Sequence, residues 1–226
     1  MSVDITKFLI ATPLPVSDTN PLALELMGDL ALVQCPSVIT QWDSGSVMFT
    51  APTKGASSKS TKRTRCEWKE PEYWSLSSAA RHWSRQEITL GKVNWAGKVV
   101  VGQIHVKNAT TPPLKVFWNK GQITVGFRSS FDKPDVVNTV IHNDVPLGAT
   151  FKLSIGVTSN GSVSINVLCN GVPSIKMAWK LDTSWQGQVL QFHGGVYNQV
   201  DYTDDTPVDD GSVSVISELS VTHGVV

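Results

Sequence analysis

The chain of 226 residues carries 19 basic and 19 acidic side chains, so its formal net charge at pH 7 is zero. With 41% apolar residues, it can bury a sizeable core as a single domain over residues 1–226. It has no apolar run long enough to cross a membrane, and the neutral balance without an Arg-rich helix or tail argues against nucleic-acid binding.

Basic residues are nevertheless concentrated in one part of the chain. Residues 54–107 hold 11 Lys or Arg against 4 Asp or Glu, whereas residues 201–210 hold five Asp and no basic residue. A local basic surface attracts an anionic partner, and an acidic polysaccharide fits better than nucleic acid. Some of the eight Trp side chains could line a ligand surface, although most are expected in the core.

Three cysteines, Cys35, Cys66 and Cys169, leave at least one thiol unpaired, and their spacing fits no zinc site. One disulfide is possible in a secreted protein, with the pairing left open. Asn108 and Asn160 begin N-glycosylation triplets, which also suit a secretory route. We therefore expect a secreted, extracellular protein, and we expect it to be a monomer.

Taken in chain order, the first clear pattern is helical. Residues 21–31 (PLALELMGDLA) predict a short amphipathic helix, and residues 51–62 (APTKGASSKSTK) predict an exposed polar loop. Beyond this loop, runs rich in β-branched residues predict strands. These strands are expected at residues 98–107, 122–128, 150–157, 162–169 and 211–222.

Turn signals separate the strands. Residues 119–121 (NKG), 159–161 (SNG) and 170–171 (NG) are typical hairpin connections, so residues 150–179 should form consecutive antiparallel strands. The chain contains no internal repeat and no interdomain linker. These patterns predict an all-β fold, a jelly-roll-like sandwich of two curved antiparallel sheets.

Three segments place polar side chains on one face of a strand, because residues two apart share a face. In the segment TRCEWKE, Arg65, Glu67 and Lys69 share one face. Cys66 and Trp68 share the other face and should be buried.

The strand at residues 98–107 divides in the same way. Gln103, His105 and Lys107 lie on its polar face. Its apolar face comprises Val100, Gly102, Ile104 and Val106. One buried and one polar face are typical of a strand that covers a core.

The third segment is FHGGVYNQ, at residues 192–199. Its polar face carries His193, Gly195, Tyr197 and Gln199. Its opposite face carries Phe192, Gly194 and Val196. Glycines inside a strand indicate a place where a ligand or another backbone comes close, so they favour a functional role for Tyr197.

Arg, Gln, His and Tyr on such faces suit one chemistry, the β-elimination of uronic acid polymers. The C5 proton of a uronate is poorly acidic until the neighbouring carboxylate is neutralised. Arg65 can neutralise it with its forked donors, and Gln103 can donate to the same carboxylate. His105 or Tyr197 can then move protons, and no metal or other cofactor is required.

Stereochemistry divides the proton transfers. In β-1,4-linked D-glucuronate or D-mannuronate, the C5 hydrogen and the O4 leaving group lie on the same face of the sugar. Tyr197 could therefore remove the first proton and return it to the leaving oxygen. L-Guluronate has an inverted C5 and needs a base on the opposite face, for which His105 is the candidate; His105 could otherwise be only a ligand of the carboxylate.

The three segments resemble the motifs of the alginate lyases of polysaccharide lyase family seven: Arg-Ser/Thr-Glu-Leu/Val-Arg, Gln-Ile/Val-His and Tyr-Phe-Lys-Ala-Gly-x-Tyr-x-Gln. This sequence has RCEWK, QIH and FHGGVYNQ in the same order. The resemblance implies a β-jelly roll with a concave catalytic cleft. It also implies catalytic roles for Arg65, Gln103, His105 and Tyr197.

The sequence departs from these motifs at positions that include Cys66 for Ser or Thr, Trp68 for a small aliphatic residue, Lys69 for the second Arg and His193 for Lys. The pattern resembles more closely the glucuronan lyases of polysaccharide lyase family twenty. We therefore expect a lyase that cleaves β-1,4-polyglucuronate to 4,5-unsaturated oligouronates. The alternatives are an alginate lyase acting on polymannuronate and a non-catalytic carbohydrate-binding module. A glycoside hydrolase would need paired carboxylates, and Glu67 has no evident partner.

Other residues are expected to bind substrate without catalysing the reaction. These are Glu67, Lys69, His82, Lys107, His193 and Gln199. His82 is included because Arg81, Trp83 and Arg85 surround it. A structural calcium ion is possible in such lyases, and residues 201–210 could supply ligands, although a solvated loop is the more common outcome for such a stretch.

Overall fold

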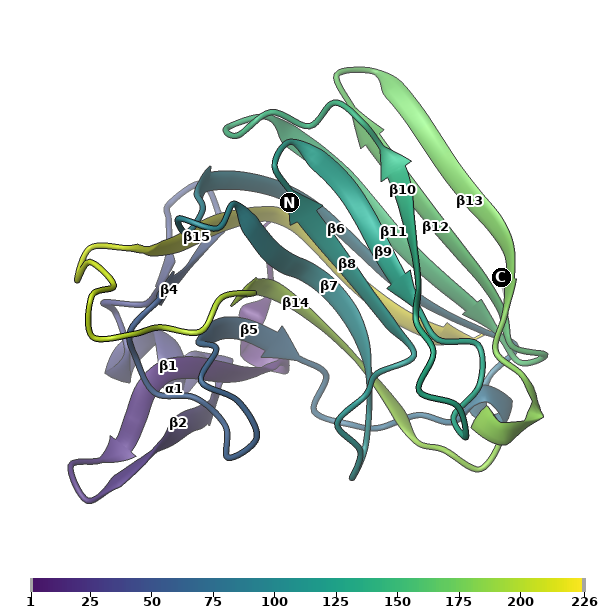
Figure 1. The fold of residues 1–226 in the computed structure, drawn as a ribbon, viewed down its shortest axis with the longest axis horizontal. Coiled ribbons are helices and arrows are strands. Elements are labelled where there is room, and N and C mark those ends of the chain that lie inside the picture. The colour runs from purple at the N-terminus through teal and green to yellow at the C-terminus, as the bar shows by residue number, and fades with distance from the viewer. Residues whose placement is uncertain (1, 225–226) are drawn as a thin grey trace.

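The computed structural model describes residues 2–224, in which two large antiparallel sheets are stacked (Figure 1). The front sheet has eight strands in the order β10-β9-β8-β7-β14-β5-β1-β2. Their bounds, in that order, are Val137–His142, Gln122–Phe127, Leu114–Asn119, Lys98–Val106, Leu190–Asn198, Arg65–Lys69, Leu9–Ser17 and Asn20–Met27. The place of β14 between β7 and β5 brings together three segments that are far apart in the sequence.

The back sheet has seven strands in the order β13-β12-β11-β6-β15-β4-β3. Their bounds, in that order, are Val172–Lys180, Ser162–Cys169, Thr150–Thr158, Arg81–Lys92, Gly211–Gly224, Val47–Pro52 and Ile39–Gln41. The remaining elements are one helix, α1 (Gly28–Gln34), and the short 3-10 turns Ile5–Lys7, Leu76–Ser78 and Thr183–Trp185. Within residues 2–224, no helix has the length and apolarity needed to cross a membrane. The predicted two-sheet antiparallel sandwich is confirmed.

The hairpins predicted from turn residues are present. β11 pairs with β12, β12 with β13 and β8 with β9, always antiparallel. Lys120 and Asn170 adopt φ angles of 50° and 51°, and the glycine after each also has a positive φ. Two successive left-handed residues are typical of the turns that join twisted antiparallel strands, which explains why such short sequences specify hairpins.

The core lies between the two sheets and includes a hydrogen bond that links them. Trp68 of the front sheet is fully buried, and its indole N–H donates to Gln86 Oε1 of the back sheet over 2.9 Å. Gly194 leaves room for this contact, because a Cβ at that position would lie 2.4 Å from the same oxygen. This glycine therefore serves the packing of the sheets.

The prediction of a helix at residues 21–31 is wrong over most of that segment. Residues 20–27 form β2, an edge strand paired with β1, and α1 begins only at Gly28. A short amphipathic pattern is compatible with either element, and the pairing with β1 decides in favour of the strand. The sequence patterns also fail to predict β1, β3, β4, β6, β8 and β10.

A β-bulge interrupts the alternation predicted for β7. The register shifts between Val100 and Gly102. As a result Val101 joins the main core, while Val100, predicted on the core face, packs against Phe117 and Tyr197 on the other face. Bulges re-aim side chains next to functional sites, and this one gives Tyr197 an apolar wall.

The three cysteines are buried and free, so no disulfide links Cys35, Cys66 and Cys169. Complete burial raises the pKa of the Cys66 thiol above its ordinary range. Its Sγ donates to the Val38 carbonyl over 3.4 Å. These thiols are packing residues of the core.

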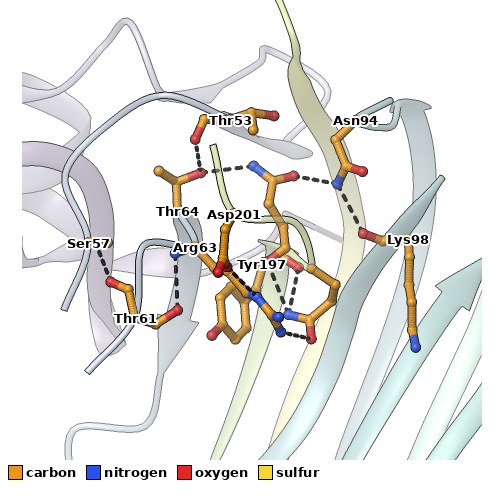
Figure 2. Close-up of polar contacts among 11 residues, drawn as sticks. Thr53, Ser57, Thr61, Arg63, Thr64, Asn94, Lys98, Tyr197 and Asp201 are labelled. Carbon is orange, nitrogen blue, oxygen red and sulfur yellow. Dashed lines mark hydrogen bonds and ion pairs between the residues drawn. The ribbon is translucent and has the colours of Figure 1, made fainter. Parts of the chain in front are cut away.

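A buried polar network holds the end of β14 (Figure 2). The Asn198 amide nitrogen donates to Thr64 Oγ1 and to the Ala51 carbonyl, each over 2.9 Å. Its oxygen accepts from Asn94 Nδ2 over 2.9 Å and from Ser212 Oγ over 2.7 Å. Asn198 is fully buried, so these four bonds tie β14 to the residue before β5 and to strands β4 and β15 of the back sheet.

Asn198→Ala should lower the free energy of unfolding by about 2–4 kcal/mol, because it removes four buried hydrogen bonds, those to Thr64, Ala51, Asn94 and Ser212. Urea unfolding at pH 7 measures this change. The matched control is Asn138→Ala on the exposed face of β10, which should change the free energy by less than about 0.5 kcal/mol. A similar loss in both variants would contradict the role of the network.

Candidate active site

A cleft of about 530 Å³ lies on the face of the front sheet opposite the core. Side chains of β5, β7, β8 and β14 line it, with contributions from β1, β2 and the loops at residues 58–61 and 109–112. Its charged, histidine, amide and tyrosine side chains are Glu25, Arg65, Lys69, Tyr73, Gln103, His105, Lys115, Gln191, His193 and Tyr197. The cleft thus brings together all four residues predicted to be catalytic.

Glu67 lies beneath the cleft and connects two of these residues. It is fully buried, and its carboxylate accepts hydrogen bonds from Gln103 Nε2 over 2.8 Å and from Arg65 Nη1 over 3.4 Å. Burial raises the pKa of Glu67, and the positive charges of Arg65 and Lys69 oppose that shift. Glu67 does not line the cleft, so its place is that of a positioning residue and not of the substrate ligand predicted from the sequence.

The contact between Gln103 and Glu67 passes over β14, which lies between their two strands. The β14 residue paired with Glu67 is Gly195, so no side chain blocks the contact. Gly195 has a φ of 114°, and a Cβ there would lie 2.5 Å from the Cys66 carbonyl oxygen. Only glycine fits this position, and the close approach expected at this glycine is to the neighbouring backbone.

Tyr197 lines the cleft near the end of β14, beside the network that holds this strand (Figure 2). The guanidinium carbon of Arg65 lies 3.9 Å from the centre of the tyrosine ring. A cation over an aromatic ring at this distance is attracted by the ring electrons. Arg65 is therefore held from two sides, by the carboxylate of Glu67 and by the ring of Tyr197.

His105 and His193 stack face to face, with ring centres 5.0 Å apart and 8° between the ring planes. Gln191 donates through its amide nitrogen to the Glu70 carbonyl, so its oxygen faces His193 Nε2, 2.7 Å away. Burial, together with nearby cations, lowers the pKa of His105 to about 4 and that of His193 well below its ordinary value. Both rings are therefore neutral near pH 7.

Two lysines add positive charge to the cleft. Lys69 forms an ion pair with Glu25 of β2. Lys115 of β8 is half-buried, and burial lowers its pKa. Lys115 and Gln191 were not among the residues predicted from the sequence. Lys115 stands directly opposite Gln103 in the sheet, and its place beside the other cleft residues is evident only when β8 is known to pair with β7.

His82, predicted to bind substrate, lies outside the cleft. It is fully buried on β6 in the back sheet, where its ring stacks on Trp74 with centres 4.2 Å apart. Its Nδ1 lies 2.7 Å from Nδ1 of His223. The neighbours that suggested a sugar contact, Arg81 and Trp83, point to the opposite face of the strand, because side chains alternate.

Lys107 and Gln199 also do not line the cleft. Lys107 is exposed just after β7, and its ammonium lies 5.2 Å from the ring centre of Tyr73, a residue of the cleft wall. Gln199 follows β14, and its side-chain oxygen accepts from Arg63 Nη1 over 3.5 Å. Lys107 thus lies next to the rim, and Gln199 packs beside the end of β14.

The acidic stretch at residues 201–210 is engaged in contacts within the protein. Asp201 pairs with Arg63 over 2.8 Å, and Asp210 accepts hydrogen bonds from Thr53 and from the backbone N–H of Trp95. Among the residues that the structure describes, no group of three or more His, Cys, Asp or Glu could hold a metal ion. These contacts tie the stretch to the rest of the protein as a loop, which is the outcome favoured for it from the sequence.

Comparison with known proteins gives a consistent result. A family model described as alginate lyase matches residues 3–223. An alginate lyase from Pseudomonas aeruginosa has a TM-score of 0.82 at 22% identity, with 98% of this chain and 100% of that chain covered. An alginate lyase from Klebsiella pneumoniae has a TM-score of 0.82 at 21% identity, with 99% and 97% covered. Alginate lyase A1-II′, a member of polysaccharide lyase family 7, has a TM-score of 0.78 at 20% identity, with 97% and 96% covered. No curated protein matches the chain.

The neutral, buried His105 should make the folded protein lose stability in acid. The unfolded chain protonates His105 near the ordinary pKa of 6.5, whereas the folded chain does so only near 4. Between these values the unfolded state holds more protons, so the free energy of unfolding falls as the pH drops through this window. His105→Asn removes this titration, and its loss of stability between pH 7 and pH 5 should be smaller than that of the wild type.

Urea unfolding of both proteins at pH 7 and pH 5 measures the two losses. His193 contributes in the same direction and remains in both proteins. Equal losses in the wild type and His105→Asn would show that His105 is not a buried neutral residue.

Proposed function

Because the chain belongs to the alginate lyase family, we propose that it cleaves alginate by β-elimination at β-1,4-linked D-mannuronate units. As a member of that family it is a polysaccharide lyase. The observation that carries the proposal is the arrangement of three residues in one cleft. Arg65 and Gln103 are oriented by a single buried carboxylate, and Tyr197 lies directly beneath the guanidinium.

In the proposed reaction, Arg65 and Gln103 bind the carboxylate of the reacting sugar. The Gln103 amide nitrogen has two protons, and since one is donated to Glu67, the other is available to the substrate. Arg65 likewise has further donors beyond the one that faces Glu67. Their positive potential neutralises the carboxylate and stabilises the enolate that forms when the C5 proton leaves.

Tyr197, as the phenolate, removes the C5 proton. The electron pair of that bond passes through the enolate into the C4=C5 double bond, the C4–O4 bond breaks, and the phenol returns the proton to O4. Both groups lie on one face of D-mannuronate, so one residue serves both steps. The guanidinium above the ring stabilises the phenolate charge, and the neutral His105 accepts a hydrogen bond from the sugar on the other side.

We propose mannuronate in place of the glucuronan expected from the sequence, because the structure removes part of the reason for expecting glucuronan. Two of these departures from the motifs, Cys66 and Trp68, are fully buried in the core, so they cannot distinguish one uronate from another. Lys69 and His193, in contrast, line the cleft. The family match supports alginate, and no comparison supports glucuronan. Secretion and a monomeric state remain part of the proposal.

Incubation with polymannuronate, polyguluronate and glucuronan tests the substrate. The ultraviolet absorbance of the 4,5-unsaturated product should rise fastest with polymannuronate. No rise with any of the three would overturn the elimination, and a faster rise with glucuronan would overturn the choice of substrate. Activity confined to polyguluronate would reject the same-face mechanism of Tyr197.

Tyr197→Phe should lower kcat on polymannuronate by roughly 10²–10⁴-fold, because it removes the only group assigned to both proton transfers. The dissociation constant of polymannuronate, measured by calorimetry, should stay within about threefold, since the ring under Arg65 is retained. Tyr202→Phe is the matched control, because Tyr202 lies in the loop after β14 and does not line the cleft. Activity of Tyr197→Phe equal to that of this control would refute the assigned role.

A further inference from the structure

We propose that Lys115 binds the carboxylate of a second uronate, one sugar away from the unit that reacts. This inference rests on the proposed function and names a residue that determines specificity for consecutive uronates in the same cleft. It concerns binding and not proton transfer.

The basic side chains of the cleft differ in whether they have an acidic partner. Arg65 faces the carboxylate of Glu67, and Lys69 is paired with Glu25. Lys115 also lines the cleft, but within residues 2–224 it forms no ion pair. Among the cations of this cleft, Lys115 is therefore the one without an ion-pair partner, and the carboxylate of Glu67 acts on it only from beyond ion-pair distance.

The placement of Lys115 makes an unpaired cation costly. The side chain extends from β8 into the cleft, and its ammonium lies 5.5 Å from the ring centre of Tyr197. Burial of this kind disfavours the charged form, and burial is the main cause that lowers the pKa of Lys115. A half-buried ammonium in a ligand cleft is best explained by an anionic group that arrives with the ligand.

The geometry of the sheet identifies that anionic group. Lys115 stands directly opposite Gln103, one strand further from Arg65. A carboxylate held between Arg65 and Gln103 lies over β14, two strand spacings or roughly 9.6 Å from the backbone of β8. The Lys115 side chain shortens this distance, because its ammonium reaches back to within 5.5 Å of the ring centre of Tyr197. A chain that crosses the strands therefore presents the sugar next to the reacting one to Lys115. Each sugar of a polyuronate carries a carboxylate, whereas a neutral polysaccharide offers none.

Lys115→Met tests the inference, because it keeps the length of the side chain and removes the charge. In the Tyr197→Phe background, the dissociation constant of a polymannuronate tetramer should rise roughly tenfold, the size expected for one lost charge-assisted hydrogen bond. With Tyr197 intact, KM for polymannuronate should rise similarly while kcat stays within about twofold. The dependence of KM on salt concentration should also become weaker. Lys115→Arg should restore most of the affinity.

The matched control is Lys180→Met, at the end of edge strand β13 in the back sheet, where the side chain is exposed. It should leave the dissociation constant, KM and kcat unchanged. Lys115→Met should not lower the melting temperature, because it removes a half-buried charge; a lower melting temperature with unchanged affinity would mean a structural role and would overturn the inference.

Three further outcomes show whether this inference or the proposed function fails. If the wild type cleaves polymannuronate and Lys115→Met leaves its affinity unchanged, the inference fails alone. If kcat falls while affinity is retained, Lys115 acts on the charge of Tyr197 and the inference is again overturned. If no polyuronate is cleaved but Lys115→Met still weakens binding of the tetramer, the elimination fails and the inference stands.

Discussion

The arrangement of the cleft depends on one hydrogen bond that passes over a strand. Gln103 of β7 and Glu67 of β5 are separated by β14, and they meet because Gly195 has no side chain. The same carboxylate accepts a hydrogen bond from Arg65, and the guanidinium of Arg65 lies over the ring of Tyr197. A single buried acid thus sets the relative positions of Arg65, Gln103 and Tyr197. Preorganised donors of this kind do not have to reorient when charge develops on the substrate.

The sequence could indicate the four residues predicted to catalyse the reaction because each lies within a short motif on a strand. Arg65 and Tyr197 pair directly across β5 and β14, and Gln103 pairs with His193. What the sequence could not provide is the order of strands in the sheet. The contribution of Lys115 depends on β8 lying next to β7, and no local pattern specifies a partner 12 residues away.

Other differences between the predictions from the sequence and the structure arise at single residues or within single strands. The bulge at Val101 reverses the face on which Val100 lies, and a period-two pattern has no means of marking it. His82 has basic and aromatic neighbours in sequence, but these neighbours lie on the opposite face of β6. The motif departures at Cys66 and Trp68 suggested a change of substrate, whereas both side chains belong to the core. A difference from a motif is informative about substrate only when the side chain lies in the cleft.

The three buried thiols bear on how this protein can be made and handled. Since Cys35, Cys66 and Cys169 are buried and unbridged, the folded state contains no disulfide among them. Reductants added during purification therefore have no disulfide to break. A thiol reagent can reach Cys66, which is fully buried, only when the chain opens. The rate at which Cys66 reacts with such a reagent therefore measures how often the chain opens.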